Sequence, residues 1–221
     1  MPSSKSIGFA PAFQTPMPPA FVYLDLGNVI AMFDRERAFR QMASVCGAPV
    51  PTVRDAVMEG LQADLESGRL GWNEFHAEFS RRTGTHSDST TLAQAASDIF
   101  TLNVPMLPVI AALERARVPL GILSNTCHAH WQHLLDLRWG ILPGGFRELV
   151  LSYEAGSSKP EPAIFALATK RAGVPPDAIF FADDLPEHVA AARVAGWDAE
   201  LFTSAARLAH DLADRGLNLG L

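Results

Sequence analysis

The stretch FVYLDLGNV, residues 21–29, decides the fold of this chain. Its first four residues are apolar, aromatic or β-branched, and a glycine and an asparagine follow within a few positions. A short apolar run that ends in this way is typical of a buried strand in a parallel sheet. Ligands of such sheets bind beyond the carboxyl ends of the strands. Asp25, directly after the run, stands where a substrate would meet the sheet, although an aspartate that only caps the turn fits this stretch equally well.

From Pro105 onward the sequence alternates between helical and extended patterns. Apolar segments predict strands at 118–123, 148–152, 178–181 and 199–202. The segments around them predict helices at 106–117, 129–138, 161–172 and 187–195, and a last helix near the C-terminus. Alternation of this kind specifies an α/β fold, in which a Rossmann-like parallel sheet carries helices on both faces.

Residues 35–103 show helical patterns and no strand pattern. They predict four helices, at 35–43, 51–65, 72–83 and 90–101. Trp72, Phe75 and Phe79 recur at helical spacing, which predicts that they form the core of this segment. We therefore expect three parts: a disordered leader at 1–20, an α/β core made of 21–34 and 104–221, and an inserted helical cap domain at 35–103.

The composition argues against several classes of partner. The net charge is −6 and the pI is near 5.6, so neither nucleic acid nor an anionic membrane surface is an expected partner. No apolar stretch approaches the ~20 residues of a membrane-spanning helix. Cys46 and Cys127 lie far apart and in no metal-binding spacing, so we expect reduced thiols in a cytoplasmic protein.

Polar residues follow three of the expected strands at the end where ligands bind. Asp25 follows the first strand, Ser124 and Asn125 end the second, and Asp183 and Asp184 follow a later one. Because parallel strands share one carboxyl edge, we expect these side chains to meet there. Three carboxylates in a partly buried cleft would repel one another, and a bound Mg²⁺, which prefers hard oxygen ligands, would relieve that repulsion.

A single lysine completes this set of groups. Lys159 lies between two expected elements, in the segment Ser157-Ser158-Lys159-Pro160-Glu161-Pro162. The two prolines stiffen the segment and help to start the following helix, so the ammonium group is presented at a helix N-terminus. A cation, neutral hydrogen-bond donors and a bridging metal are the groups that phosphoryl transfer uses. Together they predict a phosphoryl-transfer site.

Four segments resemble, in order, the motifs of the haloacid-dehalogenase (HAD) superfamily. They are Asp25-Leu-Gly-Asn-Val, Leu123-Ser-Asn-Thr, Lys159-Pro-Glu-Pro and Phe181-Ala-Asp-Asp-Leu-Pro-Glu. The resemblance covers residues 21 to about 203, essentially the whole folded part. The helical insert is similar to the small α-helical cap of that superfamily. The opening motif resembles the bacterial branch that contains sugar-1-phosphate phosphatases.

The resemblance implies a role for each matched residue. Asp25 would attack phosphorus and form an aspartyl-phosphate. Asp25, the backbone carbonyl of Gly27 and Asp184 would hold Mg²⁺. Asp183 would assist them. The residues that would hold the phosphoryl group and steady the nucleophile are Ser124, Asn125 and Lys159. The cap would close over the site, exclude bulk water and choose the leaving group.

Gly27 departs from the pattern of most phosphatases in this family. They carry a second aspartate two residues after the nucleophile, which protonates the leaving group and later activates water. Glycine has no side chain for either task, and general acid–base catalysis is typically worth ~10²–10⁴-fold. We therefore expect a preference for activated esters such as sugar-1-phosphates, acyl phosphates and aryl phosphates. The similar branch also has glycine here, so Gly27 does not by itself predict inactivity.

Several other residues are candidates for the site. His188 stands four residues after Asp184, where the family often has an outer metal partner; one helical turn would place both on one face. It would then bind a metal-bound water or supply the missing proton, or else be a surface histidine without a chemical role. The same two interpretations apply to His128 and His130. Cap residues that are candidates for the leaving-group pocket are Trp72, Arg69 and His76.

The leading hypothesis is a Mg²⁺-dependent phosphatase acting on a small phosphorylated metabolite, as a monomer or a homodimer. A second hypothesis, motivated by Gly27, is a catalytically weakened phosphate-binding or regulatory protein. A third is a carbon–halogen hydrolase of the same superfamily, whose halide leaves without protonation. The acidic pair Asp183-Asp184 argues against the third, because a dehalogenase needs no metal.

Overall fold

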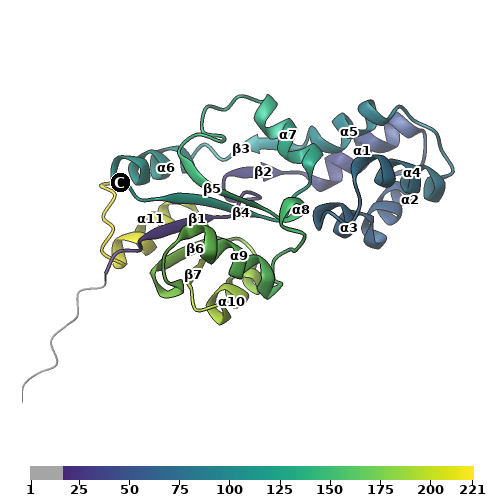
Figure 1. Ribbon diagram of the computed structural model, residues 1–221. Coiled ribbons are helices and arrows are strands. Elements are labelled where there is room, and N and C mark those ends of the chain that lie inside the picture. The colour runs from purple at the N-terminus through teal and green to yellow at the C-terminus, as the bar shows by residue number, and fades with distance from the viewer. Residues whose placement is uncertain (1–16) are drawn as a thin grey trace, which may run out of the picture.

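The computed structural model describes residues 17–221 (Figure 1). The leader expected at 1–20 therefore lies almost entirely outside the described residues. The first strand begins at Phe21, where the apolar run of the sequence begins. Across the described part of the chain, no helix is both long and apolar enough to cross a lipid bilayer.

In the described residues, five parallel strands form one sheet in the order β5-β4-β1-β6-β7. Their bounds are β1 Phe21–Leu24, β4 Leu120–Ser124, β5 Phe146–Leu151, β6 Ile179–Asp183 and β7 Asp198–Leu201. β1 lies in the middle, and Leu24 pairs with Ile122 on one side and with Ala182 on the other. This register aligns the carboxyl ends of β1, β4 and β6. The predicted parallel sheet is confirmed.

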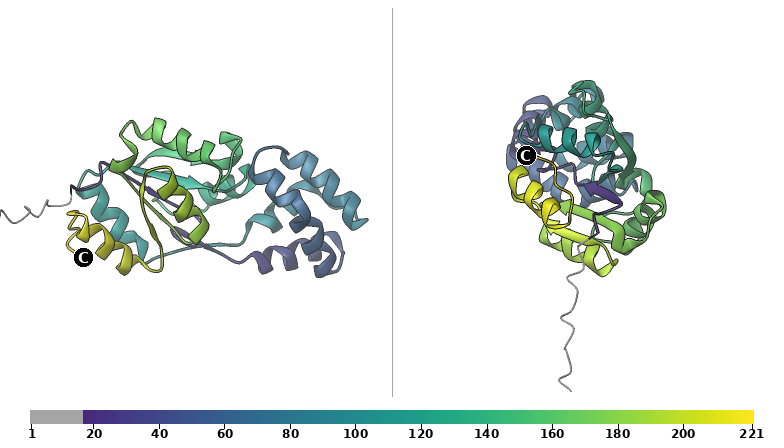
Figure 2. Two further views of the ribbon diagram at one scale, coloured as in Figure 1. Left: turned by 90° about the horizontal axis from the view of Figure 1, so that it is seen from below. Right: turned by 90° about the vertical axis from the view of Figure 1, so that its left-hand side faces the viewer.

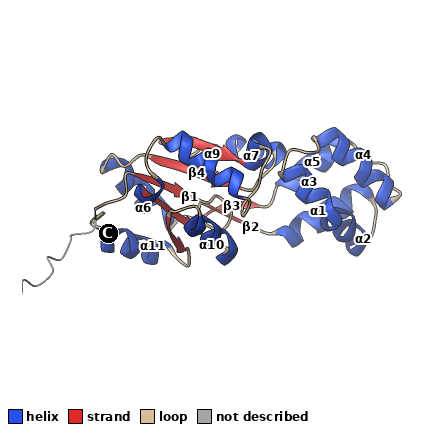
Figure 3. Cartoon of the chain, turned by 60° about the horizontal axis from the view of Figure 1, so that its bottom comes forward, coloured by secondary structure: helices blue, strands red, loops and turns tan. Residues whose placement is uncertain are grey.

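Helices cover both faces of the sheet, as predicted (Figure 3). One face packs on α6 (Met106–Arg115), α7 (His128–Asp136) and α11 (Ala205–Asp214), and the other on α9 (Pro162–Ala172) and α10 (Pro186–Val194). Two short helical segments lie next to strands. α8 (Ser152–Ala155) follows β5, and η2 (Pro176–Ala178) precedes β6.

Alternate side chains of β1 enter the two halves of the core. Val22 and Leu24 face the side of α6, α7 and α11, whereas Phe21 and Tyr23 face the side of α9 and α10. The alternation is the period-two geometry of a strand, and it makes every residue of β1 buried. The Tyr23 hydroxyl donates to the carbonyl oxygen of Ala168 at 2.9 Å, so its polar end is satisfied within the core.

The segment after β1 forms a separate helical unit with its own core (Figure 2). Its helices are α1 (Arg35–Cys46), α2 (Val50–Ala56), α3 (Gln62–Glu66), α4 (Trp72–Thr83) and α5 (Ser89–Ser97). Phe75 and Phe79 are buried within it and Trp72 packs on Phe75, as their helical spacing predicts. The helix expected at 51–65 is broken by the π-turn η1 (Val57–Leu61), where Gly60 takes a φ of 99°. Glycine adopts this left-handed conformation at little cost.

The expectation of helices without strands across 35–103 is wrong. β2 (Ala31–Phe33) and β3 (Phe100–Leu102) pair antiparallel, with Ala31 opposite Leu102 and Phe33 opposite Phe100. The helix expected to continue to Thr101 ends at Ser97, and β3 replaces its last turn. Each strand is three residues long and is stabilised by a partner far away in the sequence, so the local pattern carries no signal for it.

Candidate active site

Three carboxylates meet at the carboxyl ends of β1 and β6. Asp25 follows the last residue of β1, Asp183 ends β6, and Asp184 comes next. One carboxylate oxygen of each lies within 4.8 Å of the others. Asp25 is 6% exposed and Asp183 is fully buried. The aligned strand ends produce this cluster, because Leu24 pairs with Ala182 and the backbone N–H of Asp25 donates to the Ala182 carbonyl oxygen.

Lys159 lies between two of these carboxylates. Its Nζ is 2.7 Å from Asp25 Oδ1, 2.6 Å from Asp183 Oδ2 and 2.8 Å from the carbonyl oxygen of Leu123. The lysine side chain is 1% exposed, so its three donors are used in a dry environment. Burial disfavours the charged form, but Asp25 and Asp183 outweigh burial and hold the pKa of Lys159 above its ordinary value.

Asn125 holds the backbone of Lys159. Its Nδ2 donates to the Lys159 carbonyl oxygen at 2.8 Å, and its Oδ1 accepts from the Lys159 N–H at 2.8 Å. The pair of bonds ties the loop after β4 to the segment before α9. The side-chain amide is therefore committed to positioning the lysine. Ser124 is buried, and its hydroxyl makes a contact of 3.5 Å with the carbonyl oxygen of Asn125, which is long for a hydrogen bond. Their expected contacts with phosphate stay predictions.

The electrostatics of the cluster favour a cation. Burial raises the pKa of Asp25 to about 6; Lys159 opposes this shift and Asp183 adds to it. Burial also acts to raise the pKa of Asp183, but Lys159 and His188 overcome it and hold that pKa below its ordinary value. Within the described cluster, three carboxylates face one ammonium group. The unbalanced negative charge and the hard oxygen donors fit a divalent cation such as Mg²⁺.

Asn28 orients the third carboxylate. Its Nδ2 donates to Asp184 Oδ2 at 2.9 Å, and its backbone adopts a positive φ of 55°. Asparagine tolerates this left-handed conformation better than most residues. Asn28 was not among the residues predicted to form the site. The Gly-Asn turn after β1 was the available signal, since an asparagine in a tight turn is often there for its backbone conformation.

His188 contacts Asp183 and not Asp184. Its Nδ1 lies 3.0 Å and 3.1 Å from the two carboxylate oxygens of Asp183. The expectation that His188 and Asp184 share one helix face is wrong, because α10 begins at Pro186 and Asp184 precedes it. The interpretation as a surface histidine is also wrong, because His188 is 6% exposed and lines the cavity described next.

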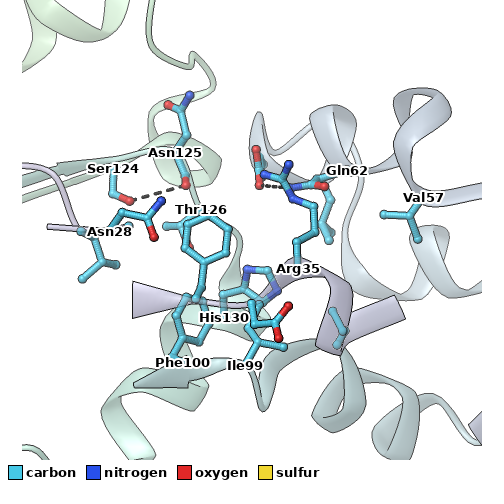
Figure 4. Close-up of a pocket in the computed structure, with 18 of the residues that line it drawn as sticks. Asn28, Arg35, Val57, Gln62, Ile99, Phe100, Ser124, Asn125, Thr126 and His130 are labelled. Atoms are coloured by element: carbon cyan, nitrogen blue, oxygen red, sulfur yellow. Dashed lines mark hydrogen bonds between the residues drawn. The ribbon is translucent and has the colours of Figure 1, made fainter. Parts of the chain in front are cut away.

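A cavity of about 640 Å³ separates the carboxylate cluster from the helical unit. Figure 4 shows Asn28, Ser124 and Asn125 from the α/β core facing Arg35 and Gln62 across it. Phe100 and His130 also line this space. A cavity of this size accommodates a small metabolite in addition to a phosphate group.

The other candidates divide into two groups. Trp72 and His130 line the cavity. His76 contacts the Ser87 carbonyl oxygen at 2.9 Å, Arg69 pairs with Asp64 at 2.7 Å, and His128 packs edge-on against Tyr153. Those three are not among the residues that line the cavity. The cap residues that line it without having been singled out include Arg35, Gln62 and Glu66.

Comparison with known proteins identifies the family. The model of the haloacid dehalogenase-like hydrolases matches residues 25–196, which span the strand-end cluster and the helical insert. The chain belongs to this family. It is therefore a HAD-like hydrolase, and the resemblance inferred from the four motifs is confirmed.

Relatives of this HAD-like hydrolase include a curated phosphatase and two proteins of known structure. A D-ribitol-5-phosphate phosphatase of Bacteroides thetaiotaomicron is 27% identical over 175 residues, which are 74% of this chain and 82% of the relative. A HAD family enzyme from the same organism, solved with magnesium and inorganic phosphate, is 24% identical with a TM-score of 0.75, covering 83% of this chain and 94% of that chain. A protein of Porphyromonas gingivalis described as a predicted HAD-like family hydrolase is 28% identical with a TM-score of 0.70, covering 86% of this chain and 93% of that chain.

In this HAD-like hydrolase, an aromatic ring stands beside the glycine that replaces the expected second aspartate. A Cβ added at Gly27 would lie 3.1 Å from Cε1 of Phe33, on β2. Such a contact is tighter than normal, so the ring would have to move for any larger residue. Phe33 and Gly27 both line the cavity. The space for an acid at this position is therefore partly taken by a phenyl ring.

Proposed function

We propose that this HAD-like hydrolase is a Mg²⁺-dependent phosphatase of a small phosphorylated metabolite. The observation that carries the proposal is the buried Asp25–Lys159–Asp183 cluster, with Asp184 beside it, at the base of a cavity large enough for the rest of a substrate. The D-ribitol-5-phosphate phosphatase of B. thetaiotaomicron, 27% identical, supports a phosphate ester as the substrate.

Asp25 acts as the nucleophile in this proposal. A carboxylate oxygen of Asp25 forms a bond to phosphorus while the bond from phosphorus to the leaving oxygen breaks, and the leaving oxygen takes up a proton from water. Water then attacks the phosphorus of the aspartyl-phosphate and loses a proton to the solvent, while the bond from phosphorus to the Asp25 oxygen breaks, which releases inorganic phosphate and restores the Asp25 carboxylate. Lys159 keeps Asp25 ionised and in place, and it offsets the charge that develops on the phosphoryl oxygens.

Mg²⁺ would be held by Asp25, the carbonyl oxygen of Gly27 and Asp184, with Asp183 assisting. When bound, it supplies positive charge that reduces the repulsion between the anionic nucleophile and the anionic ester. Ser124 lines the phosphate end of the cavity and offers a hydroxyl donor. Asn125 contributes mainly by holding Lys159, through the paired backbone hydrogen bonds described above.

The nature of the leaving group follows from Gly27. No side chain at position 27 can protonate it, so esters of good leaving groups, such as sugar-1-phosphates, suit the site best. The relative is named for a phosphate on a primary alcohol, which is a poorer leaving group. The ratio of rates on these two kinds of ester therefore measures how much the missing acid matters.

The first experiment is hydrolysis of p-nitrophenyl phosphate with Mg²⁺, with EDTA, and with Asp25→Asn. Activity that requires both the metal and Asp25 supports the proposal. Loss of all turnover with retained binding of inorganic phosphate would favour a phosphate-binding protein, the alternative that Gly27 motivates. Metal-independent release of halide from haloacids would favour the carbon–halogen hydrolase.

A further inference from the structure

Polar side chains interrupt the apolar wall on the cap side of the cavity. The apolar side chains of that wall include Phe39, Met42, Trp72, Phe75 and Phe100. Arg35, Gln62, Glu66 and His130 also line the cavity. Gln62 Nε2 donates to Glu66 Oε1 at 2.7 Å, and Figure 4 shows Arg35 and Gln62 on the cap side of the cavity. None of these groups takes part in the proposed chemistry at Asp25.

The main chain at Glu66 is fixed to the α/β core. The Ser152 hydroxyl, fully buried, donates to the Glu66 carbonyl oxygen at 2.5 Å and accepts from the Thr126 N–H at 2.9 Å. Thr126 directly follows Asn125, so one hydroxyl links the cap to the loop that positions Lys159. Gly68, two residues after Glu66, packs against Tyr153, the residue after Ser152. A Cβ at Gly68 would lie 2.3 Å from the carbonyl oxygen of Tyr153. Glu66 therefore has a defined position relative to Asp25.

Glu66 and His130 approach the cavity from opposite units. Glu66 ends α3 of the cap, whereas His130 lies in the first turn of α7 in the core, with its ring edge-on to Phe100 at 5.3 Å. Burial lowers the pKa of His130, although Glu66 opposes the shift, and this favours the neutral form of the ring. A neutral imidazole offers one donor and one acceptor, and a carboxyl group offers acceptors.

The charge of Glu66 indicates what it binds. A carboxylate repels phosphate, so Glu66 is unsuited to the phosphate end of a substrate. It suits hydroxyl groups, which donate to a carboxylate, and buried polar groups require such partners. Burial holds the pKa of Glu66 above its ordinary value, although the hydrogen bond from Gln62 and the charge of Arg35 act to lower it.

We propose that Glu66 and His130 form a hydroxyl-binding subsite that selects a sugar or alditol as the leaving group. The inference rests on the proposed phosphatase function and makes it more specific. The phosphate lies at Asp25 and Lys159, and the hydroxyl-bearing chain extends across the cavity to Glu66 and His130. The aromatic part of the wall packs against the carbon backbone of that chain.

The test compares substrates with and without hydroxyl groups. Glu66→Gln keeps the shape of the side chain and the carbonyl oxygen that Ser152 binds, so the cap loop stays in place. We expect kcat/KM to fall by about 10- to 100-fold on the best substrate of a panel of sugar and alditol phosphates, as for the loss of a charged hydrogen bond. The loss on p-nitrophenyl phosphate is expected to be at least about tenfold smaller. His130→Asn should also lower kcat/KM more on the sugar or alditol phosphate than on p-nitrophenyl phosphate.

Glu59→Gln is the matched control. Glu59 is an exposed glutamate at the kink of the same cap segment and is not among the residues that line the cavity. This variant should behave like the wild type on both substrates. Equal losses of Glu66→Gln on both substrates, or no loss on either, would overturn the inference.

Calorimetry separates this inference from the proposed function. The wild type should bind the best sugar or alditol phosphate of the panel more tightly than inorganic phosphate, and Glu66→Gln should remove most of that difference. If the wild type lacks turnover but shows this binding pattern, the phosphatase proposal fails and the subsite stands. If the wild type turns over p-nitrophenyl phosphate with Mg²⁺ but binds both ligands equally, the phosphatase stands and the subsite is wrong.

Discussion

Lys159 is the residue on which the charge balance of the site depends. Its ammonium group is buried between Asp25 and Asp183, at 2.7 Å and 2.6 Å. Removing one partner of a buried ion pair leaves an uncompensated charge in the protein interior. This costs far more folding stability than replacing the whole pair with apolar residues of similar volume. The lysine is therefore a structural element of this cluster, and in the proposed mechanism it is also a catalytic one.

Lys159→Met should destabilise the metal-free protein by about 3–5 kcal/mol, and turnover of p-nitrophenyl phosphate should be lost. The two carboxylates would then face each other without a cation, so added Mg²⁺ should recover part of the stability by binding only the folded state. Urea unfolding with and without Mg²⁺ measures both effects. Lys170→Met, at an exposed lysine of α9, is the control and should be neutral. A stable Lys159→Met protein would contradict the role assigned to the ion pair.

Gly27→Asp tests whether a missing acid limits the enzyme. The new side chain requires Phe33 to move, because its Cε1 lies 3.1 Å from the position of the added Cβ. We expect rates on alkyl phosphates to rise by up to about 100-fold, with a smaller change on aryl phosphates. Steady-state rates on one ester of each kind measure the ratio. A variant that is folded but inactive on both, also when combined with Phe33→Leu, would refute the missing-acid explanation.

Much of the phosphate end of the site could be predicted from single residues. Asp25, Asp183 and Asp184 directly follow strand signals, and parallel strands bring such residues to one edge. Asn28 and Glu66 could not be predicted in this way, because their importance depends on partners far away in the chain, Asp184 and Ser152. The motif predicted a phosphate contact for Asn125, and the bonds of its amide to the backbone of Lys159 could not be predicted from it.

At the scale of elements, helices and buried strands were predictable where they are long or apolar on both faces. β1 and β6 are fully buried and have clear sequence patterns. β2 and β3 are three residues each, and their pairing is a tertiary contact that no local pattern encodes. The residue at which α10 begins also affects the arrangement of the site. Asp184 lies before the helix, and His188 contacts Asp183.

Ser152→Ala tests the contact between the cap loop and the core. The Thr126 N–H and the Glu66 carbonyl oxygen would each lose a partner, so we expect a loss of about 1–3 kcal/mol of stability. Amide hydrogen exchange should rise around residues 66–70, where the loop is released. Ser158→Ala, which removes a hydroxyl from a partly exposed serine in the next loop, is the control. Unchanged exchange at 66–70 would mean that Ser152 does not hold the loop.

At the scale of the whole molecule, we expect folding stability to depend on the pH and on metal binding through the ionisation of the site. The pKa of Asp25 is about 6 in the folded protein, above its ordinary value of 3.8. The folded state therefore holds this proton more tightly than the unfolded state does. The stability that the protonated group contributes is present below its ordinary pKa and is lost as the pH rises through about 6.

Thermal unfolding between pH 5 and 8 checks this sign. Without metal, the contribution of Asp25 should fall as the pH rises through about 6. Mg²⁺ competes with the proton for the carboxylate, so its stabilising effect should grow over the same range. In Asp25→Asn both pH dependences should be reduced. A Mg²⁺ effect that is independent of pH in the wild type would exclude Asp25 as a ligand with a raised pKa.

The pairing of β2 with β3 has a consequence for how such an enzyme could change over evolutionary time. The chain leaves the core at Ala31 and returns at Leu102, and these two residues are direct neighbours. An insertion whose ends already touch imposes little loop-closure entropy on its host, whatever its length. The cap can thus be exchanged as a cassette while β1, β4 and β6 keep the phosphate chemistry unchanged. A new specificity would then arrive by replacement of one segment, with no alteration of the strand ends.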